Sequence, residues 1–207
     1  MNKRLFIGVI SFMLIICAIL SLSSCSGKAP NMDDVKERFV YLIEESKELN
    51  VIFFGTGLPI YRKDGELAQR QMVYYNDNAS GYNKVLLEKS EYLSIDDMKA
   101  AAEKVYSDEY LSELYESLFD GIMTGDANAY VRFYDSTEWL YQDIDAGEFA
   151  LSERIYDYST MKIVKPSNSK YVTVSIESYT LKNPSRISID LSFVYENGDW
   201  YLDSPTY

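Results

Sequence analysis

The sequence predicts an α+β fold, in which an N-terminal amphipathic helix and a pair of short helices pack on a curved antiparallel sheet that ends in a β-meander. Two observations predict this fold. Apolar residues recur at helical spacing in segments between residues 31 and 120, whereas they alternate with polar residues in segments beyond residue 125. Helices that come first and strands that come last indicate helices packed on one face of an antiparallel sheet.

The first predicted helix spans residues 31–50. Its apolar positions form one stripe, with charged residues on the opposite face. The stripe consists of Val35, Phe39, Leu42, Ile43 and Leu49. Asp33 and Asp34 lie in the first turn, where negative charge is favourable beside the positive end of the helix dipole. The glycines and the proline of residues 55–59 break regular structure, so the helix ends before them.

A short strand and two short helices are predicted for the middle of the chain. Residues 71–75 are rich in β-prone side chains. Ser94 and Asp97 have the spacing of a capping box, with aspartate in place of glutamate, and a helical apolar stripe follows them. Ser107 precedes two acidic residues and a second stripe, which predicts a helix that ends by Gly121.

The C-terminal part predicts neighbouring antiparallel strands. Apolar and polar residues alternate in residues 172–176 and 187–193, so each strand is expected to have one buried and one exposed face. The pair Asn197-Gly198 favours a type I′ hairpin, because both central residues of that turn need positive φ. The hairpin returns the chain into a last strand, and residues 155–165 are expected to precede these strands in the same sheet.

The N-terminal segment predicts export. A short positive region precedes an apolar run that ends at residue 22, the layout of an export signal. The four residues that close the segment are Leu22, Ser23, Ser24 and Cys25. They resemble the lipobox of bacterial lipoproteins, in which the cysteine is acylated and becomes the new N-terminus. An uncleaved membrane helix and an ordinary secretory signal are the alternatives.

The resulting organisation is a signal peptide over residues 1–25, a short tether over 26–30 and a single α+β domain over 31–207. Lipid attachment at Cys25 would hold the domain on the outer face of the cytoplasmic membrane, because two or more acyl chains give a stable anchor. A tether of five residues spans at most about 17 Å. The domain is therefore expected close to the bilayer.

Charge and composition exclude several classes of function. Removal of residues 1–25 takes away Lys3 and Arg4 and no acidic residue, so the formal net charge of −12 becomes −14. Such a charge disfavours nucleic acid and bare anionic lipid as partners and suits a cationic partner. The chain has no histidine, and its two cysteines are Cys17 and Cys25. Histidine-dependent nucleophiles, the usual zinc sites and disulfides are therefore not expected in the mature domain.

No catalytic residue, metal ligand or cofactor site is predicted. Asp143, Asp145 and Gly147 resemble the start of a calcium loop, but its sixth and twelfth positions hold Glu148 and Arg154 instead of glycine and glutamate. Residues 55–57 have two of the three glycines of a nucleotide-binding fingerprint, after a helix and not a strand. No pair of carboxylates is marked as an acid and base of a glycosidase.

Tyrosine is the strongest compositional peculiarity, with 19 in the chain. A tyrosine ring can stack on a sugar or anchor a protein interface, because it combines a large rigid face with a polar tip. The candidate binding surface consists of Tyr130, Tyr134, Trp139, Tyr141, Tyr156 and Tyr158. The alternative is that these rings are partly exposed side chains of a sheet with one wet face.

Taken together, the segments resemble the DL-endopeptidase inhibitor family of Gram-positive bacteria. The resemblance rests on the N-terminal helix, on the short-helix segments 93–99 and 106–110, and on a meander that ends in residues 198–207, Gly-Asp-Trp-Tyr-Leu-Asp-Ser-Pro-Thr-Tyr. It implies a non-catalytic domain that occludes the cleft of a cell-wall peptide hydrolase. Members of that family often have a plain secretory signal, and the lipobox departs from that pattern.

The same strand-rich ending also resembles the nuclear transport factor 2-like and cystatin-like superfamilies, where a helix lies in the palm of a bent sheet. That resemblance implies a module that binds a small ligand or a glycan in the concave face. A third reading is an accessory subunit of another envelope protein. All three predict a binding domain without catalysis.

Overall fold

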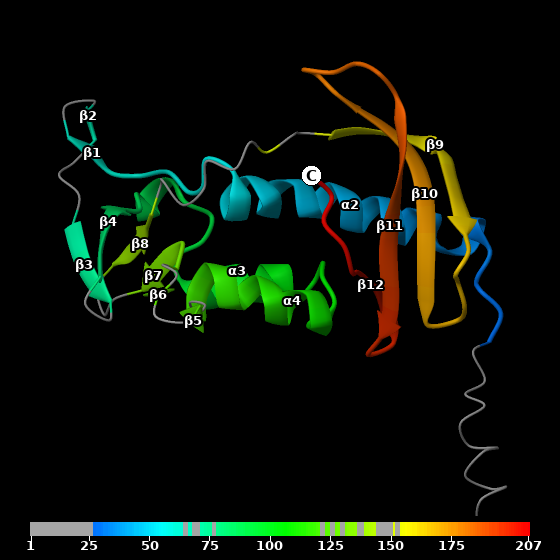
Figure 1. Ribbon diagram of the computed structural model, residues 1–207, viewed down its shortest axis with the longest axis horizontal. Helices are drawn as coiled ribbons and strands as arrows, with labels where there is room; N and C mark the ends of the chain where they lie inside the picture. Colours follow the sequence, from blue (N-terminus) through cyan, green and yellow to red (C-terminus); the bar gives the residue numbers. More distant parts are fainter. Residues whose placement is uncertain are drawn as a thin grey trace, which may run out of the picture.

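The computed structural model describes an elongated molecule with an antiparallel sheet at each end of one long helix, α2 (Figure 1). The described residues are 27–63, 66–67, 71–75, 78–120, 123–124, 127–128, 131–135, 139–143, 151 and 154–207. The predicted α+β class is confirmed. Among these residues, no helix combines the length and the apolar character needed to cross a membrane.

Helix α2 spans Met32–Phe54 and is one turn longer than predicted. The apolar stripe continues past residue 50, because Ile52 and Phe53 extend the buried face. The helix ends at Gly55, whose N–H donates to the carbonyls of Asn50 and Val51 at 3.2 and 3.1 Å. At about 1.5 Å per residue, the 23 residues of the helix span roughly 34 Å.

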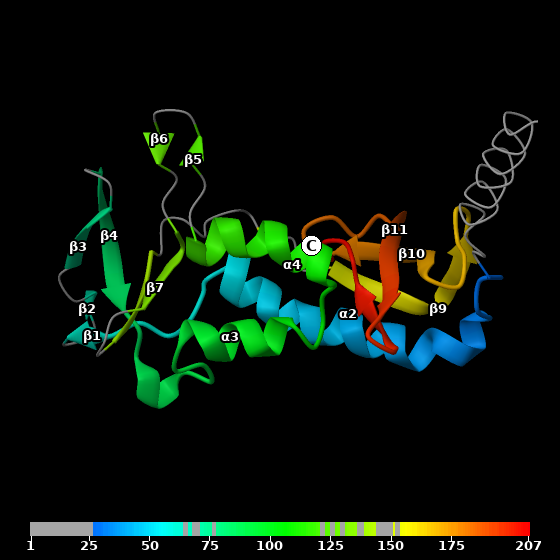
Figure 2. The same ribbon diagram turned by 90° about the horizontal axis from the view of Figure 1, so that it is seen from below.

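The two short helices begin at the predicted caps. Helix α3 spans Ile95–Ala102, and Ser94 Oγ accepts a hydrogen bond from Asp97 N at 3.1 Å. Helix α4 spans Asp108–Tyr115, and Ser107 Oγ accepts from Tyr110 N at 3.2 Å. The helical path then continues through the π-helical turn η2, Glu116–Asp120, and a 3₁₀ turn, η1, spans Leu87–Lys89. Figure 2 shows α3 and α4 running alongside α2.

The larger sheet is the predicted meander. It contains β9 (Arg154–Val164), β10 (Tyr171–Thr180), β11 (Ile187–Glu196) and β12 (Asp199–Leu202), all antiparallel, in the order β12-β11-β10-β9. Asn197 and Gly198 have φ of 52° and 91°, which confirms the predicted type of hairpin. The expectation of one exposed face is wrong for β10, where Thr173 and Ser175 are also buried. Strand β10 lies between β9 and β11, which shield these two residues from solvent. The Ser175 hydroxyl is also hydrogen-bonded to the Ser188 hydroxyl at 2.7 Å.

The strand predicted at residues 71–75 belongs to a second, smaller sheet. That sheet contains β3 (Gln71–Tyr75), β4 (Asn78–Lys84), β7 (Phe133–Asp135) and β8 (Leu140–Gln142), in the order β3-β4-β8-β7. Two further hairpins pair β1 (Arg62–Lys63) with β2 (Glu66–Leu67), and β5 (Met123–Thr124) with β6 (Ala127–Asn128). The strands therefore form two four-stranded sheets, where the sequence predicted one.

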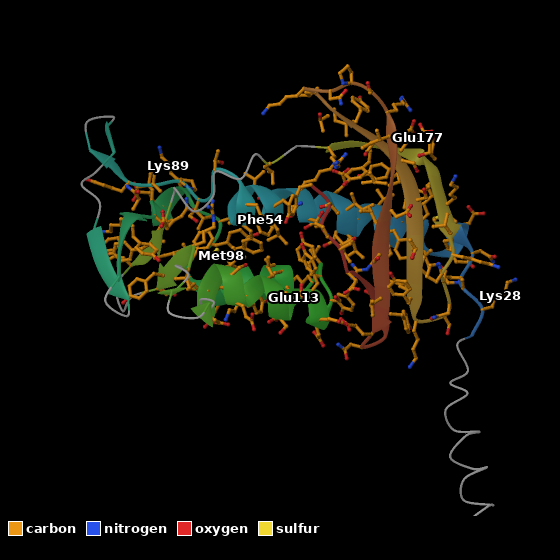
Figure 3. The ribbon with its side chains drawn as sticks, viewed as in Figure 1. Lys28, Phe54, Lys89, Met98, Glu113 and Glu177 are labelled. Atoms are coloured by element: carbon orange, nitrogen blue, oxygen red, sulfur yellow. The ribbon has the colours of Figure 1, made fainter. Side chains whose placement is uncertain are left out.

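The main core lies between α2 and the elements around it. Phe39 of α2 stacks on Phe193 of β11, with ring centroids 3.9 Å apart, and meets the edge of Trp200 at 5.5 Å. From the other side, Met98 of α3 is fully buried, and Figure 3 shows it facing the space beside α2. Helix α2 thus fills the concave side of the larger sheet with its own side chains.

Candidate functional site

One face of the smaller sheet gathers aromatic side chains from three strands. Register pairs Lys84 of β4 and Tyr134 of β7 with Tyr141 of β8, and paired residues point to the same side of a sheet. Alternate residues along a strand share a face, so Tyr82 and Trp139 join them. These five residues, Tyr82, Lys84, Tyr134, Trp139 and Tyr141, form the aromatic face.

The aromatic face is separate from the main core. Phe133 and Leu140, which alternate with Tyr134 and Tyr141, point the other way and are almost fully buried in the main core. Tyr82 and Tyr141 belong instead to a small cluster of their own with Val131. Described aromatic or apolar side chains therefore lie on both sides of this sheet, and those of Phe133 and Leu140 belong to the main core.

The tyrosine rings of the aromatic face form a row in which each ring contacts the next. Tyr134 lies between Tyr82 and Tyr141, with centroid distances of 6.3 and 6.2 Å. The hydroxyl of Tyr82 donates to the carbonyl of Val131 at 2.8 Å, and the ammonium of Lys84 lies over the ring of Trp139. Such contacts hold the rings in fixed orientations before any partner arrives, which reduces the entropy lost on binding.

Exposure varies across this face in a way that suits binding. Tyr82 and Tyr141 are buried, whereas Tyr134 and Trp139 keep 37% and 38% of their surface exposed. Binding sites of proteins commonly combine exposed aromatic anchors with a rigid support behind them. The arrangement can stack on a sugar ring, or it can seat a side chain of a protein partner.

The other two predicted tyrosines of the surface lie in the larger sheet and face α2. Tyr156 is buried and its hydroxyl donates to the carbonyl of Thr206 at 2.6 Å. The Tyr158 hydroxyl donates to the carboxylate of Glu44, and burial together with this bond raises the pKa of Tyr158. Although burial alone would raise the pKa of Glu44, hydrogen bonds from Lys47 and Tyr158 hold it below its usual value. These two rings are structural, and the expected single surface is divided between the two ends of the molecule.

The remaining predicted residues lie outside the described part of the chain. These are Tyr130 of the candidate surface and the lipobox residues Leu22, Ser23, Ser24 and Cys25. Within the described part, no group of three or more histidine, cysteine, aspartate or glutamate side chains is placed to hold a metal ion.

Sequence reasoning missed a buried arginine at the junction between α2 and the smaller sheet. Arg132 is 2% exposed, and its Nε and Nη2 donate to the carbonyls of Ile52 and Gly55 at 3.0 and 2.7 Å. Burial lowers the pKa of Arg132 to about 10, opposed by the charge of Asp143. A cation at the negative end of a helix is favourable, but Arg132 is 78 residues beyond Phe54 in the sequence, so no local pattern signals it.

A buried glutamine explains the glycine at position 57. Gln142 Oε1 accepts from Leu58 N at 2.7 Å, and its Nε2 donates to the carbonyl of Thr56 at 3.3 Å. A Cβ on Gly57, where φ is 75°, would lie 2.2 Å from Gln142 Nε2. Position 57 therefore needs glycine to receive Gln142, and this packing accounts for Gly57 without a bound phosphate.

Comparison with known proteins adds no assignment, since neither the protein-family models nor the curated proteins compared with the chain give a match.

Proposed function

We propose that the chain is a membrane-tethered, extracytoplasmic binding domain without catalytic activity, and that it binds its partner through the aromatic face. The observation that carries the proposal is the pair of exposed rings, Tyr134 and Trp139, backed by the buried rings of Tyr82 and Tyr141. Exposed aromatic side chains on a rigid support are typical anchors of binding surfaces.

The position of the aromatic face supports this proposal. It lies on the sheet at one end of α2, whereas the described chain begins beside the sheet at the other end (Figure 1). A lipid at Cys25 would thus be attached at the end of the molecule remote from the aromatic face. The negative charge of the domain suits a partner with a basic surface.

The partner class that we propose is a cell-wall DL-endopeptidase, which the domain would inhibit by occluding its cleft. An exposed tyrosine and tryptophan can fill a groove that otherwise binds a peptide, and no covalent step is required. The alternative ligand is a wall glycan stacked on the same two rings. A ligand in the palm of the larger sheet is disfavoured, because Phe39 and the other buried side chains of α2 fill that side.

Loss of the two exposed rings is expected to abolish most of the binding. The full chain, extracted from membranes in detergent, should slow muropeptide cleavage by at least one enzyme in a panel of wall endopeptidases. The double variant Tyr134→Ala, Trp139→Ala should require at least about 30-fold more protein for the same inhibition, because the loss of even one anchor typically costs about 2 kcal/mol.

A matched control removes two equally exposed aromatic rings from other surfaces. Tyr41 on α2 and Tyr195 on β11 are 45% and 42% exposed, so Tyr41→Ala, Tyr195→Ala should leave inhibition unchanged. Equal losses in both double variants would refute the aromatic face as the site. Unchanged cleavage rates across the panel would reject the inhibitor reading, and binding of the wild type to purified sacculi then tests the glycan alternative.

The tether has a separate test. The variant Cys25→Ser is expected to lose the diacylglyceryl mass from its N-terminus and to leave the lipid-anchored fraction. Intact-mass measurement of the membrane-extracted chain reads the modification directly. Detection of residues 1–24 in the mature wild-type chain would contradict cleavage at the lipobox and favour an uncleaved helix.

A further inference from the structure

The start of the described chain is packed against one turn of the larger sheet. Gly27 accepts a hydrogen bond through its carbonyl from Ser169 N at 2.9 Å, and Ser169 lies in the turn of residues 165–170 between β9 and β10. A Cβ on Gly27 would lie 2.8 Å from Ser169 Oγ, so the two backbones approach closely. Cys25 precedes Gly27 by two residues, which span at most about 7 Å. A lipid on Cys25 would therefore hold this turn at the membrane surface.

Three exposed lysines surround this attachment point. Lys28 follows Gly27 directly, and Lys165 and Lys170 flank the turn that contains Ser169. We call these three residues the lysine cluster. None of them makes an ion pair with any part of the chain that the structure describes. Figure 3 shows Lys28 at the end of the molecule where the described chain begins.

Several acidic groups near this end interact with other parts of the chain. At the neighbouring turn between β11 and β12, Asp199 pairs with Arg38 at 3.1 Å, and Glu196 accepts a hydrogen bond from Asp108 N at 2.9 Å. Asp33 and Asp34 lie in the first turn of α2, beside the positive end of its dipole. The three lysines of the cluster are the charged residues that lie within or directly beside the contact between Gly27 and Ser169.

The net charge of −14 predicts repulsion from an anionic bilayer, but local charge decides the interaction of a tethered surface. Charges further from the membrane than a Debye length, about 8 Å at physiological salt, are largely screened. We propose that the lysine cluster binds the headgroups of anionic phospholipids and fixes the orientation of the domain on the membrane. This inference rests on the proposed tether at Cys25.

The orientation that follows places the hairpin between β10 and β11 far from the bilayer. Its tip, residues 181–186, lies at the opposite end of β10 from the lysine cluster, and ten residues of strand span about 33 Å. Lys182 at this tip and Lys89 in η1 are exposed lysines remote from the cluster. They serve as internal references in the same molecule.

The experiment measures the reactivity of each lysine in the full lipidated chain. The chain is reconstituted into phosphatidylcholine vesicles with and without phosphatidylglycerol, treated briefly with a water-soluble amine-reactive reagent and analysed by peptide mass spectrometry. Lys28, Lys165 and Lys170 should react about fivefold more slowly on the anionic vesicles, as expected for the attraction of one lysine to an anionic surface. Lys89 and Lys182 should react equally on both. About 1 M salt should remove the difference, because the Debye length is then about 3 Å.

Variants provide a second readout, the distance of the hairpin tip from the membrane. A dye on Ser185→Cys should transfer less energy to acceptor headgroups on anionic vesicles than on neutral ones. Lys28→Gln, Lys165→Gln, Lys170→Gln should remove this difference. The double variant Lys89→Gln, Lys182→Gln removes two exposed lysines remote from the cluster and should retain it.

The possible outcomes distinguish failure of the lipid anchor from failure of the lysine cluster. A chain that fails to float with either type of vesicle refutes the lipid anchor, and the inference with it. A chain that floats with both, and whose cluster lysines react equally on both, refutes the role of the lysine cluster alone.

Discussion

Replacement of Phe39 by alanine is expected to lower the free energy of unfolding by about 3–5 kcal/mol. The Phe39 side chain is 0% exposed, its ring stacks on Phe193 and meets the edge of Trp200, and it joins α2 to the centre of the larger sheet. Truncation removes the buried apolar area and both ring contacts, and it leaves a cavity between two rigid elements that cannot collapse to fill it.

The measurement is urea unfolding followed by circular dichroism, on the same chain in detergent. Tyr41→Ala is the control, because it removes an aromatic ring two residues away on the same helix, where the ring is 45% exposed. The control should change the free energy of unfolding by no more than about 0.5 kcal/mol. A loss below about 1 kcal/mol for Phe39→Ala would contradict the packing of α2 on the larger sheet.

The second large effect is expected from Asn50→Ala, which should cost about 2–3 kcal/mol. Asn50 is buried on α2, where its Oδ1 accepts from the Tyr106 hydroxyl at 3.1 Å and its Nδ2 donates to Thr206 Oγ1 at 2.8 Å. Ser46 Oγ also contacts Thr206 Oγ1, at 2.7 Å. This network ties the C-terminal segment to α2 away from solvent. The variant leaves the buried Tyr106 hydroxyl without its acceptor. The cost of removing that hydroxyl from water is then uncompensated, which lowers the free energy of unfolding.

A double-mutant cycle identifies the network as the cause. Thr206→Val removes the shared hydroxyl at nearly constant volume. The double variant should lose less unfolding free energy than the sum of the two single variants, because both single variants delete the same hydrogen bond. Glu45→Ala, on the exposed face of the same helix, controls for the higher helix propensity of alanine. Additive losses in the cycle would show that the two residues act separately.

Features set by local interactions were predictable from the sequence. Ser94 and Ser107 cap their helices as predicted, since a cap needs only a side chain and a backbone N–H three residues away. The hairpin at Asn197-Gly198 follows from the φ values that these two residues tolerate. The meander follows in turn, because short connections join strands that are neighbours in the sheet.

The candidate site was predictable only in part. Tyr134, Trp139 and Tyr141 come from the predicted surface, but Tyr82 and Lys84 complete it through strand register, which joins residues more than fifty positions apart. Tyr156 and Tyr158 were placed in the same surface because they are near in sequence. The structure puts them under α2, where one contributes to the buried network and the other binds Glu44.

The sequence by itself determined the three helices, the caps of the two short ones, the C-terminal meander with its hairpin, the negative charge and the predicted site of lipid attachment. Tertiary structure alone decided that the strands divide into two four-stranded sheets and two separate hairpins, that β10 is buried on both faces, and that Arg132 lies at the end of α2. The reason is physical. Caps and turns depend on hydrogen bonds between residues that are a few positions apart, so a local pattern reveals them. Burial and strand pairing depend on packing between segments that are far apart in the sequence, and no local pattern shows which segments pack together.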